Sequence, residues 1–230
     1  MNANELDLGD VERNFESLFI DSIVLLEMAQ KRENILINET FSRGSAICSL
    51  LLPEVVSNIC IETLCLEKSI HNEIDKLSNL GKMDYYLRIT TKDRKIDRGI
   101  RQIQEYQELK YLRDCYVHPQ KIKMIWTRES DTLASGESEK TQCLGISKNM
   151  NLWNDETALI IMKTTHRFLS YFFKECCHFT KEMVSVLLFS QDEVPTKDGL
   201  IIPYYERRMK SILKTWDIDI SYFKVGWRTK

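Results

Sequence analysis

Arg113 and His118 stand five residues apart where a long polar helical pattern ends, immediately before Pro119. A guanidinium can hold a phosphate through two parallel hydrogen bonds, and an imidazole exchanges protons near neutral pH. The pair therefore predicts phosphate chemistry at the end of this helix. A simpler interpretation is that both cations only cap the helix C-terminus, where positive charge is favoured.

Several neighbouring side chains extend this candidate site. Asp114 could orient either His118 or Arg113, and with them it forms the candidate catalytic set. The candidate substrate-binding residues are basic, aromatic or acidic side chains near the motif or on an earlier helix: Lys110, Tyr116, Lys121, Lys123 and Glu62. For Tyr116 a place in the core is the alternative, and for Glu62 a place on a helix surface.

Charge is unevenly distributed along the 230 residues, although the net charge is only −2. Residues 82–128 hold twelve Lys and Arg against six Asp and Glu, a balance of +6 that includes the motif. Such a segment favours a polyanionic partner, and a solvated helix face is the alternative.

Hydrophobic periodicity predicts helices before the motif. Residues 9–30 carry one apolar stripe, and residues 40–78 form a second helical region, which Pro53 should break or kink near residues 51–53. The stretch after Pro53 is apolar on nearly all sides, which is typical of a central buried helix. Within it, Glu62 could instead partner a buried cation across the bundle.

A third helix is expected to begin at Thr90 or Thr91, where residues 90–93 have the form of a capping box. It should run to the motif and end there, because the residue before a proline is pushed out of the α conformation. In a continuous helix, side chains five apart diverge by about 140° and rise about 7.5 Å. Release of His118 would let its ring turn back towards Arg113.

After the motif the pattern changes to a small β-hairpin, with residues 121–127 expected to pair with 141–147 across a polar loop. A strongly apolar helix should open at Asn154 or Asp155, followed by helices near 180–190 and 204–214. The sequence thus predicts an all-α bundle of about five core helices, in residues 1–178, with a hairpin inserted at about 121–147. Residues 179–230 form a C-terminal helical extension packed on it.

Composition and cysteines indicate a cytoplasmic protein. The acidic N-terminus lacks the order of a signal peptide, and no uncharged apolar run approaches the length of a membrane span. Seven cysteines, most of them among apolar residues, argue for reduced core thiols rather than disulfides. Cys176-Cys177-His178 lacks the spacing of a zinc site, so no metal and no cofactor are expected.

The segment 113–119 resembles the R-x4–6-H motif of HEPN domains, a family of all-α bundles. Asp114 matches the polar residue that follows the arginine in that family, and Pro119 matches the proline or glycine after the histidine. Glu62 is similar to a glutamate on an earlier core helix of many members. The resemblance covers residues 10–178 and leaves the hairpin and the last 50 residues outside.

The resemblance implies a metal-independent endoribonuclease, and its usual form is a homodimer whose two motifs face one cleft. RNA would be the substrate, His118 the general acid and base, and Arg113 the group that stabilises the scissile phosphate. A toxin with an antitoxin partner, or a phage-defence effector, would fit such an activity. The alternative is a non-catalytic module that binds RNA, a nucleotide or a protein, because fold alone does not fix activity.

Overall fold

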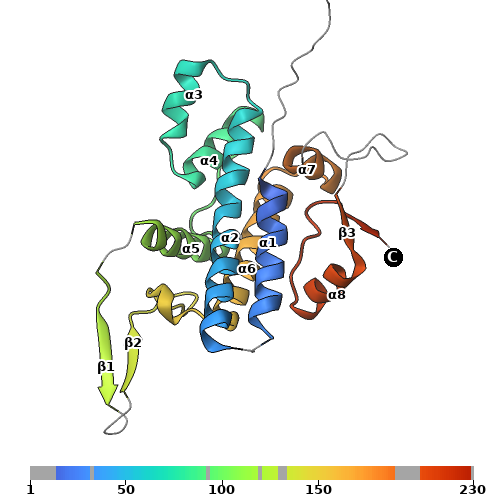
Figure 1. Ribbon diagram of the computed structural model, residues 1–230. Helices are drawn as coiled ribbons and strands as arrows, with labels where there is room; N and C mark the ends of the chain where they lie inside the picture. The colour runs from blue at the N-terminus through green and yellow to red at the C-terminus, as the bar shows by residue number, and fades with distance from the viewer. Residues whose placement is uncertain are drawn as a thin grey trace, which may run out of the picture.

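The structure is a computed structural model that describes residues 14–31, 34–91, 94–118, 121–128, 134–189 and 203–228. The chain is all-α in these ranges, with eight α-helices and two small pairs of strands, as the sequence predicted. Three helices form its centre (Figure 1): α2 (Ile35–Glu62) packs against both α1 (Phe15–Ala29) and α6 (Asp155–Ser170).

The α2 helix runs through Pro53 without ending, so, of the break or kink predicted at residues 51–53, the break is wrong. Pro53 lacks the N–H that a helical residue normally donates. It is nevertheless buried, as are its helical neighbours Leu52 and Val56, which belong to the main core. Packing on both sides of the proline therefore outweighs its low helix propensity. By length and composition alone this helix could cross a membrane, although Glu39, Arg43, Glu54 and Glu62 interrupt its apolar sequence. Its most apolar window is 61% buried inside the bundle, as in a central core helix.

Two short helices follow α2. The first, α3 (Lys68–Asp75), has no buried residue, and the second, α4 (Asn79–Thr90), buries Leu80, Met83 and Leu87. The expectation that Thr90 and Thr91 start a helix is wrong, because they end α4. Their hydroxyls donate to the carbonyls of Tyr86 and Leu87, at 2.8 and 2.5 Å, in the preceding turn. Residues 79–89 were not assigned to a helix from the sequence.

The helix that carries the motif is α5 (Arg101–Val117), shorter than predicted. Ile103, Leu109 and Leu112 are buried against the bundle, while its C-terminal end reaches the surface. His118 caps the helix with non-helical dihedrals, φ −120° and ψ 76°, and its N–H donates to the Asp114 carbonyl at 2.9 Å. The predicted end of the helix at His118 is confirmed.

The inserted hairpin pairs β1 (Met124–Arg128) with β2 (Ala134–Ser138) in antiparallel register. The predicted partner of β1, residues 141–147, is instead a tight loop closed by a Lys140–Ser147 bridge. Gly145 lies at φ +68°, a conformation that suits glycine, and the Glu108 carboxylate on α5 accepts the N–H groups of Cys143 and Leu144. Because these donors are bound to α5, the loop does not extend the sheet.

The later helices agree with the predictions. Asn154 caps α6 by accepting from the Thr157 N–H at 2.9 Å, and a π-helical turn, η2 (Tyr171–Cys176), continues it. Thr180 caps α7 (Lys181–Leu188), and α8 (Arg207–Thr215) lies where a last helix was expected. A short 3-10 helix, η1 (Met150–Leu152), precedes α6. The predicted turn at residues 197–199 lies outside the described residues.

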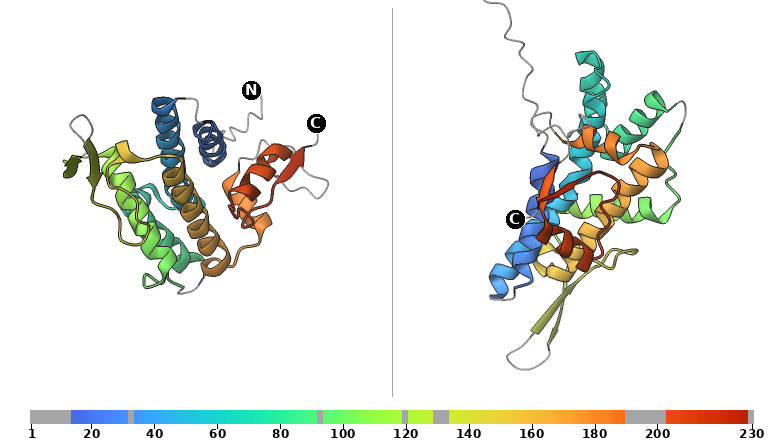
Figure 2. Two further views of the ribbon diagram at one scale, coloured as in Figure 1. Left: turned by 90° about the horizontal axis from the view of Figure 1, so that it is seen from below. Right: turned by 90° about the vertical axis from the view of Figure 1, so that its right-hand side faces the viewer.

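An aromatic cluster joins the C-terminal elements to the bundle. Phe223 packs edge-on against Phe15 and Phe19 of α1, with ring centroids 6.0 and 5.7 Å apart, and Tyr222 stacks on Phe173 at 5.8 Å. The parallel strand pair β3 (Tyr204–Glu206) and β4 (Gly226–Arg228) lies beside α8. Two views show these elements and α5 on opposite sides of the three central helices (Figure 1, Figure 2).

Candidate functional site

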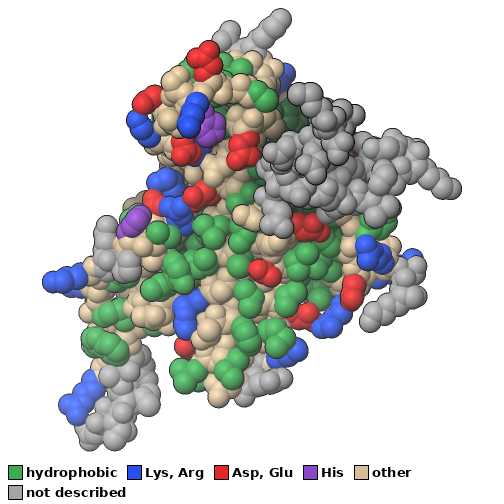
Figure 3. All heavy atoms as spheres, turned by 45° about the horizontal axis from the view of Figure 1, so that its top comes forward, with side chains coloured by type: hydrophobic (Ala, Val, Ile, Leu, Met, Phe, Trp, Pro, Cys, Tyr) green, Lys and Arg blue, Asp and Glu red, His purple; other side chains and the backbone are tan. Residues whose placement is uncertain are grey.

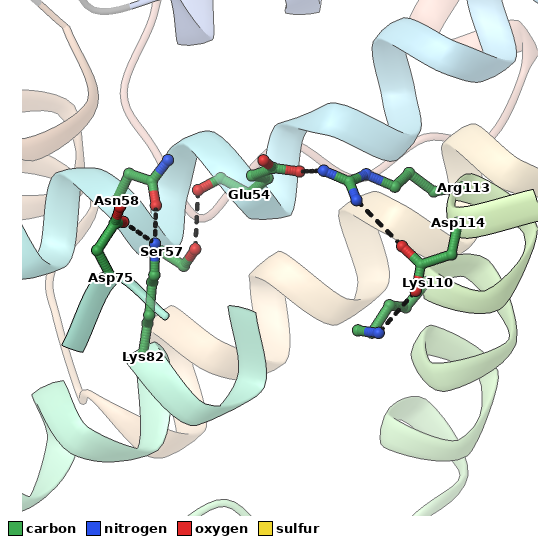
Figure 4. Close-up of polar contacts among 8 residues, drawn as sticks. All are labelled: Glu54, Ser57, Asn58, Asp75, Lys82, Lys110, Arg113 and Asp114. Atoms are coloured by element: carbon green, nitrogen blue, oxygen red, sulfur yellow. Dashed lines mark hydrogen bonds and ion pairs between the residues drawn. The ribbon is translucent and has the colours of Figure 1, made fainter. Parts of the chain in front are cut away.

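Arg113 lies on the face of α5 that turns towards α2, and two carboxylates hold its guanidinium (Figure 4). Nη2 is ion-paired with Glu54 of α2, and Nη1 donates to Asp114 at 3.0 Å. The Arg113 side chain is 24% exposed, and its Nε is buried without a hydrogen-bond partner among the described residues. Burial lowers the pKa of Arg113, but Asp114 and Glu54 outweigh it and raise the pKa above its usual value.

Asp114 links this arginine to Lys110, one helical turn earlier, whose Nζ lies 2.8 Å from Oδ2 of Asp114. Burial raises the pKa of Asp114, but the hydrogen bonds from Lys110 and Arg113 hold it below the usual range. Asp114 therefore stays ionised at neutral pH. Asp114 was predicted to orient either His118 or Arg113, and in the structure its carboxylate contacts Arg113.

A second polar cluster lies on the other side of Glu54. Lys82 of α4 is buried and donates to the Asn58 amide oxygen at 2.8 Å and to Asp75 at 2.5 Å. The hydrogen bond and charge of Lys82 lower the pKa of Asp75. Figure 4 shows both clusters along one stretch of α2. A cleft of about 360 Å³ joins them, lined largely by polar side chains from α2, α4, α5, the end of α3 and the α3–α4 connection.

His118 is exposed and lies outside this cleft. Among the described residues, no hydrogen bond or ion pair joins its imidazole to Arg113, so the expected return of the ring towards the guanidinium is not seen. Exposed apolar side chains precede it instead: Tyr116 is 36% and Val117 47% exposed. Tyr116 is thus a surface residue at the helix end rather than a core residue.

The carboxylate that meets the arginine across the bundle is Glu54, not Glu62. Glu62 is the last residue of α2 and is exposed, two helical turns beyond Glu54. Local sequence does not distinguish the two, because both glutamates lie in the same apolar helix. Lys82, Asn58 and Asp75 were also missed, since α4 was not recognised and its position beside α2 is set by tertiary packing.

The other predicted residues are dispersed. Lys121 and Lys123 are exposed on the segment that leads into β1, away from the cleft lining. Cys176 and Cys177 are buried in the core, as the packing interpretation predicted, while Cys65 is exposed, against expectation. In the described part of the chain, no group of three or more His, Cys, Asp or Glu side chains could hold a metal ion.

No protein-family model, curated protein or solved structure matches the chain. The HEPN resemblance therefore rests on the motif and its helical setting.

On the face drawn in Figure 3, Lys and Arg side chains are interspersed with Asp and Glu, and no continuous basic stripe is visible. Several arginines of the basic segment, residues 82–128, have partners: Arg94 donates to the Cys176 carbonyl at 3.3 Å, and Arg101 pairs with the buried Glu105 at 2.8 Å. The arrangement around α5 thus offers a fixed cation, a carboxylate pair and an exposed imidazole one turn away. Such a set can bind a phosphate and exchange protons with it.

Proposed function

We propose that the chain is a metal-independent endoribonuclease of the HEPN type, with the end of α5 as its active site. The supporting observation is the contrast between the two motif residues. Arg113 is held in place by Glu54 and Asp114, whereas His118 is exposed on backbone that has left the helix. A fixed cation and an exposed proton carrier at one helix end suit phosphodiester cleavage better than packing.

RNA supplies its own nucleophile, the 2′-hydroxyl. Cleavage needs a base that removes this proton, an acid that protonates the leaving 5′-oxygen, and positive charge on the five-coordinate phosphorus. We assign the proton transfers to His118. We assign the charge stabilisation to Arg113, whose five N–H donors exceed the two bonds that Glu54 and Asp114 accept. Lys110 neutralises Asp114, which keeps a carboxylate from repelling the phosphate.

One imidazole per motif supplies one proton carrier, while the reaction needs an acid and a base. A homodimer with facing motifs would bring two. Tyr116 and Val117 are exposed directly before His118, so both apolar side chains are available for contact with a partner at this point. A toxin or phage-defence role with a neutralising protein partner is consistent with such an enzyme.

One observation favours the alternative, a non-catalytic module that binds RNA, a nucleotide or a protein. Both carboxylates on Arg113 compete with a phosphate, and the guanidinium and imidazole do not touch. In that case Arg113 would be a tertiary link between α2 and α5, and the surface around His118 would only bind.

The test is cleavage of single-stranded RNA by purified protein in excess chelator. Wild type is expected to cleave, and His118→Ala to lose about 10²–10⁴-fold, the usual contribution of a general acid or base. His118 is exposed, so its variant should fold normally. The matched control is His178→Asn, another exposed histidine, at φ 56°, which asparagine tolerates.

Unchanged cleavage by His118→Ala would refute the assignment of His118. RNA binding that weakens with salt, without cleavage products, would instead establish the binding module.

A further inference from the structure

A second cleft, of about 600 Å³, lies among the C-terminal elements. It is formed by the start of α7, by α8 and by residues 217–227, on the side of the bundle opposite α5 (Figure 1, Figure 2). Four lysines and two aromatic rings line it: Lys181, Lys210, Lys214, Lys224, Phe223 and Trp227. The motif on α5 has no part in it.

Lysines outnumber carboxylates in the lining of this cleft, although Lys224 is paired with Glu182, which lies outside the lining, at 3.6 Å. Two carboxylates also line it, but each is paired with a lysine that does not: Asp217 with Lys163 at 3.7 Å and Asp219 with Lys174 at 3.5 Å. Lys210 and Lys214 are exposed and form no ion pair within the described ranges. Residues 203–228 hold six Lys and Arg against three Asp and Glu, in a chain of net charge −2. An anionic ligand is therefore favoured here.

An aromatic wall accompanies these lysines. Trp227 is half-buried on β4, tilted against Tyr205 at a centroid distance of 6.2 Å. The ammonium of Lys210 lies 5.8 Å from the Trp227 ring centroid. A cation–π contact near the surface is weak, and a planar heterocycle stacks on tryptophan more strongly. A ligand that has both a ring and an anionic group can replace this contact and engage the same lysine.

We propose that this cleft binds a nucleotide, with the base stacked on Trp227 and the phosphates at Lys210 and Lys214. The volume lies within the usual range for small-ligand sites. The nucleotide could be free or part of single-stranded RNA, because both present a base beside a phosphate. This site is independent of the proposed ribonuclease activity, and binding is measured without cleavage.

The experiment is a titration of the full chain, followed by tryptophan fluorescence, with ATP, adenosine, inorganic triphosphate and a five-nucleotide single-stranded 2′-O-methyl RNA, which lacks the nucleophile for cleavage. ATP or the RNA is expected to bind saturably. Adenosine and triphosphate should each bind at least tenfold more weakly, because each offers only half of the contacts. Tighter binding of ATP identifies a free nucleotide as the ligand, and tighter binding of RNA identifies a strand, so either result supports the proposal.

Two variants test the assignment. Trp227→Leu should weaken binding about 5- to 100-fold, the range for loss of one stacked base. The double variant Lys210→Glu with Lys214→Glu changes only exposed side chains on α8, so it still tests the proposal if Trp227→Leu unfolds. Ligand binding to this double variant is followed by calorimetry, and the affinity should fall at least tenfold. The matched control is Lys68→Glu with Lys95→Glu, two exposed lysines outside the cleft, which should bind like wild type.

Undiminished binding by the Lys210/Lys214 variant would overturn the proposal. So would triphosphate that binds as tightly as ATP and the RNA, or no saturable binding at millimolar concentrations.

Discussion

At the scale of single residues, Arg113 shows how a motif can be recognised while its environment is not. The spacing from Arg113 to His118 and the proline after it indicated a helix end, and the structure has one there. The partners of the guanidinium were not apparent, since Glu54 lies 59 positions away along the chain. Contact between them depends on how α2 and α5 cross, which no local pattern encodes.

The Glu54–Arg113 pair gives a prediction at this scale. Glu54→Gln removes the charge that faces a largely buried guanidinium, so the free energy of unfolding should fall by about 1–2 kcal/mol. Urea unfolding measures this. Glu62→Gln, an exposed residue of the same helix, is the matched control and should change stability by less than about 0.5 kcal/mol. Equal effects of the two substitutions would contradict the importance of Glu54.

At the scale of elements, α5 also holds the loop that follows the hairpin. Glu108 accepts two successive backbone N–H groups, from Cys143 at 2.7 Å and Leu144 at 3.0 Å. Burial raises the pKa of this carboxyl, but these bonds bring it below its usual value, so Glu108 is ionised at neutral pH. The loop therefore depends on a side chain from a distant helix.

Glu108→Ala should release this loop. Exchange of the Cys143 and Leu144 amide hydrogens, followed by NMR, should accelerate about 5- to 30-fold, which corresponds to roughly 1–2 kcal/mol of lost protection. Gln107→Ala changes the adjacent, exposed position of α5 and should leave both amides as protected as in wild type. Unchanged exchange in Glu108→Ala would mean that other contacts hold the loop.

A buried histidine connects α6 to the C-terminal segment. His166 Nδ1 lies 2.9 Å from the Tyr222 hydroxyl, and desolvation lowers the pKa of His166 to about 4, against an ordinary 6.5. The folded protein keeps this ring neutral, while the unfolded chain protonates it below pH 6.5. Stability is therefore fully present above that value and falls as the pH drops towards 4.

Wild type should thus lose up to roughly 3 kcal/mol of unfolding free energy from His166 between pH 6.5 and 4. His166→Gln should be less stable at pH 7 but should have a flatter pH profile. The exposed His178→Asn should keep the wild-type slope. Denaturant unfolding at several pH values provides the measurement, and an equally steep profile for His166→Gln would exclude His166 as the source.

At the scale of the whole molecule, the proposed enzyme is a dimer that places two motifs together. Val117→Asp puts a charge on an apolar side chain that is 47% exposed, so the fold should persist while self-association is lost. Sedimentation should then show a monomer, and RNA cleavage should fall with it. Ile89→Asp is the matched control, because Ile89 is 56% exposed on α4 and distant from the motif in sequence. A wild-type monomer that cleaves RNA would contradict the shared cleft.

The sequence by itself determined the fold class, most of the helices and the end of α5 at His118. These features depend on signals that neighbouring residues carry: apolar periodicity, capping side chains such as Asn154 and Thr180, and the backbone restriction before Pro119. The helix boundaries predicted from sequence were wrong where tertiary contacts outweighed local helix propensity. Pro53 stays helical because its surroundings are packed, and Thr90 and Thr91 bond back to the preceding turn.

Only the tertiary structure decided which groups meet. It selected Glu54 over Glu62 and brought Lys82 to Asn58 and Asp75 beside the same stretch of α2. It also assembled four lysines and Trp227 into a cleft from α7, α8 and β4. Such sites join residues far apart in the chain. The residues that make up each site are determined by how the helices pack against one shared core. That packing depends on the whole fold, and no local sequence pattern encodes it.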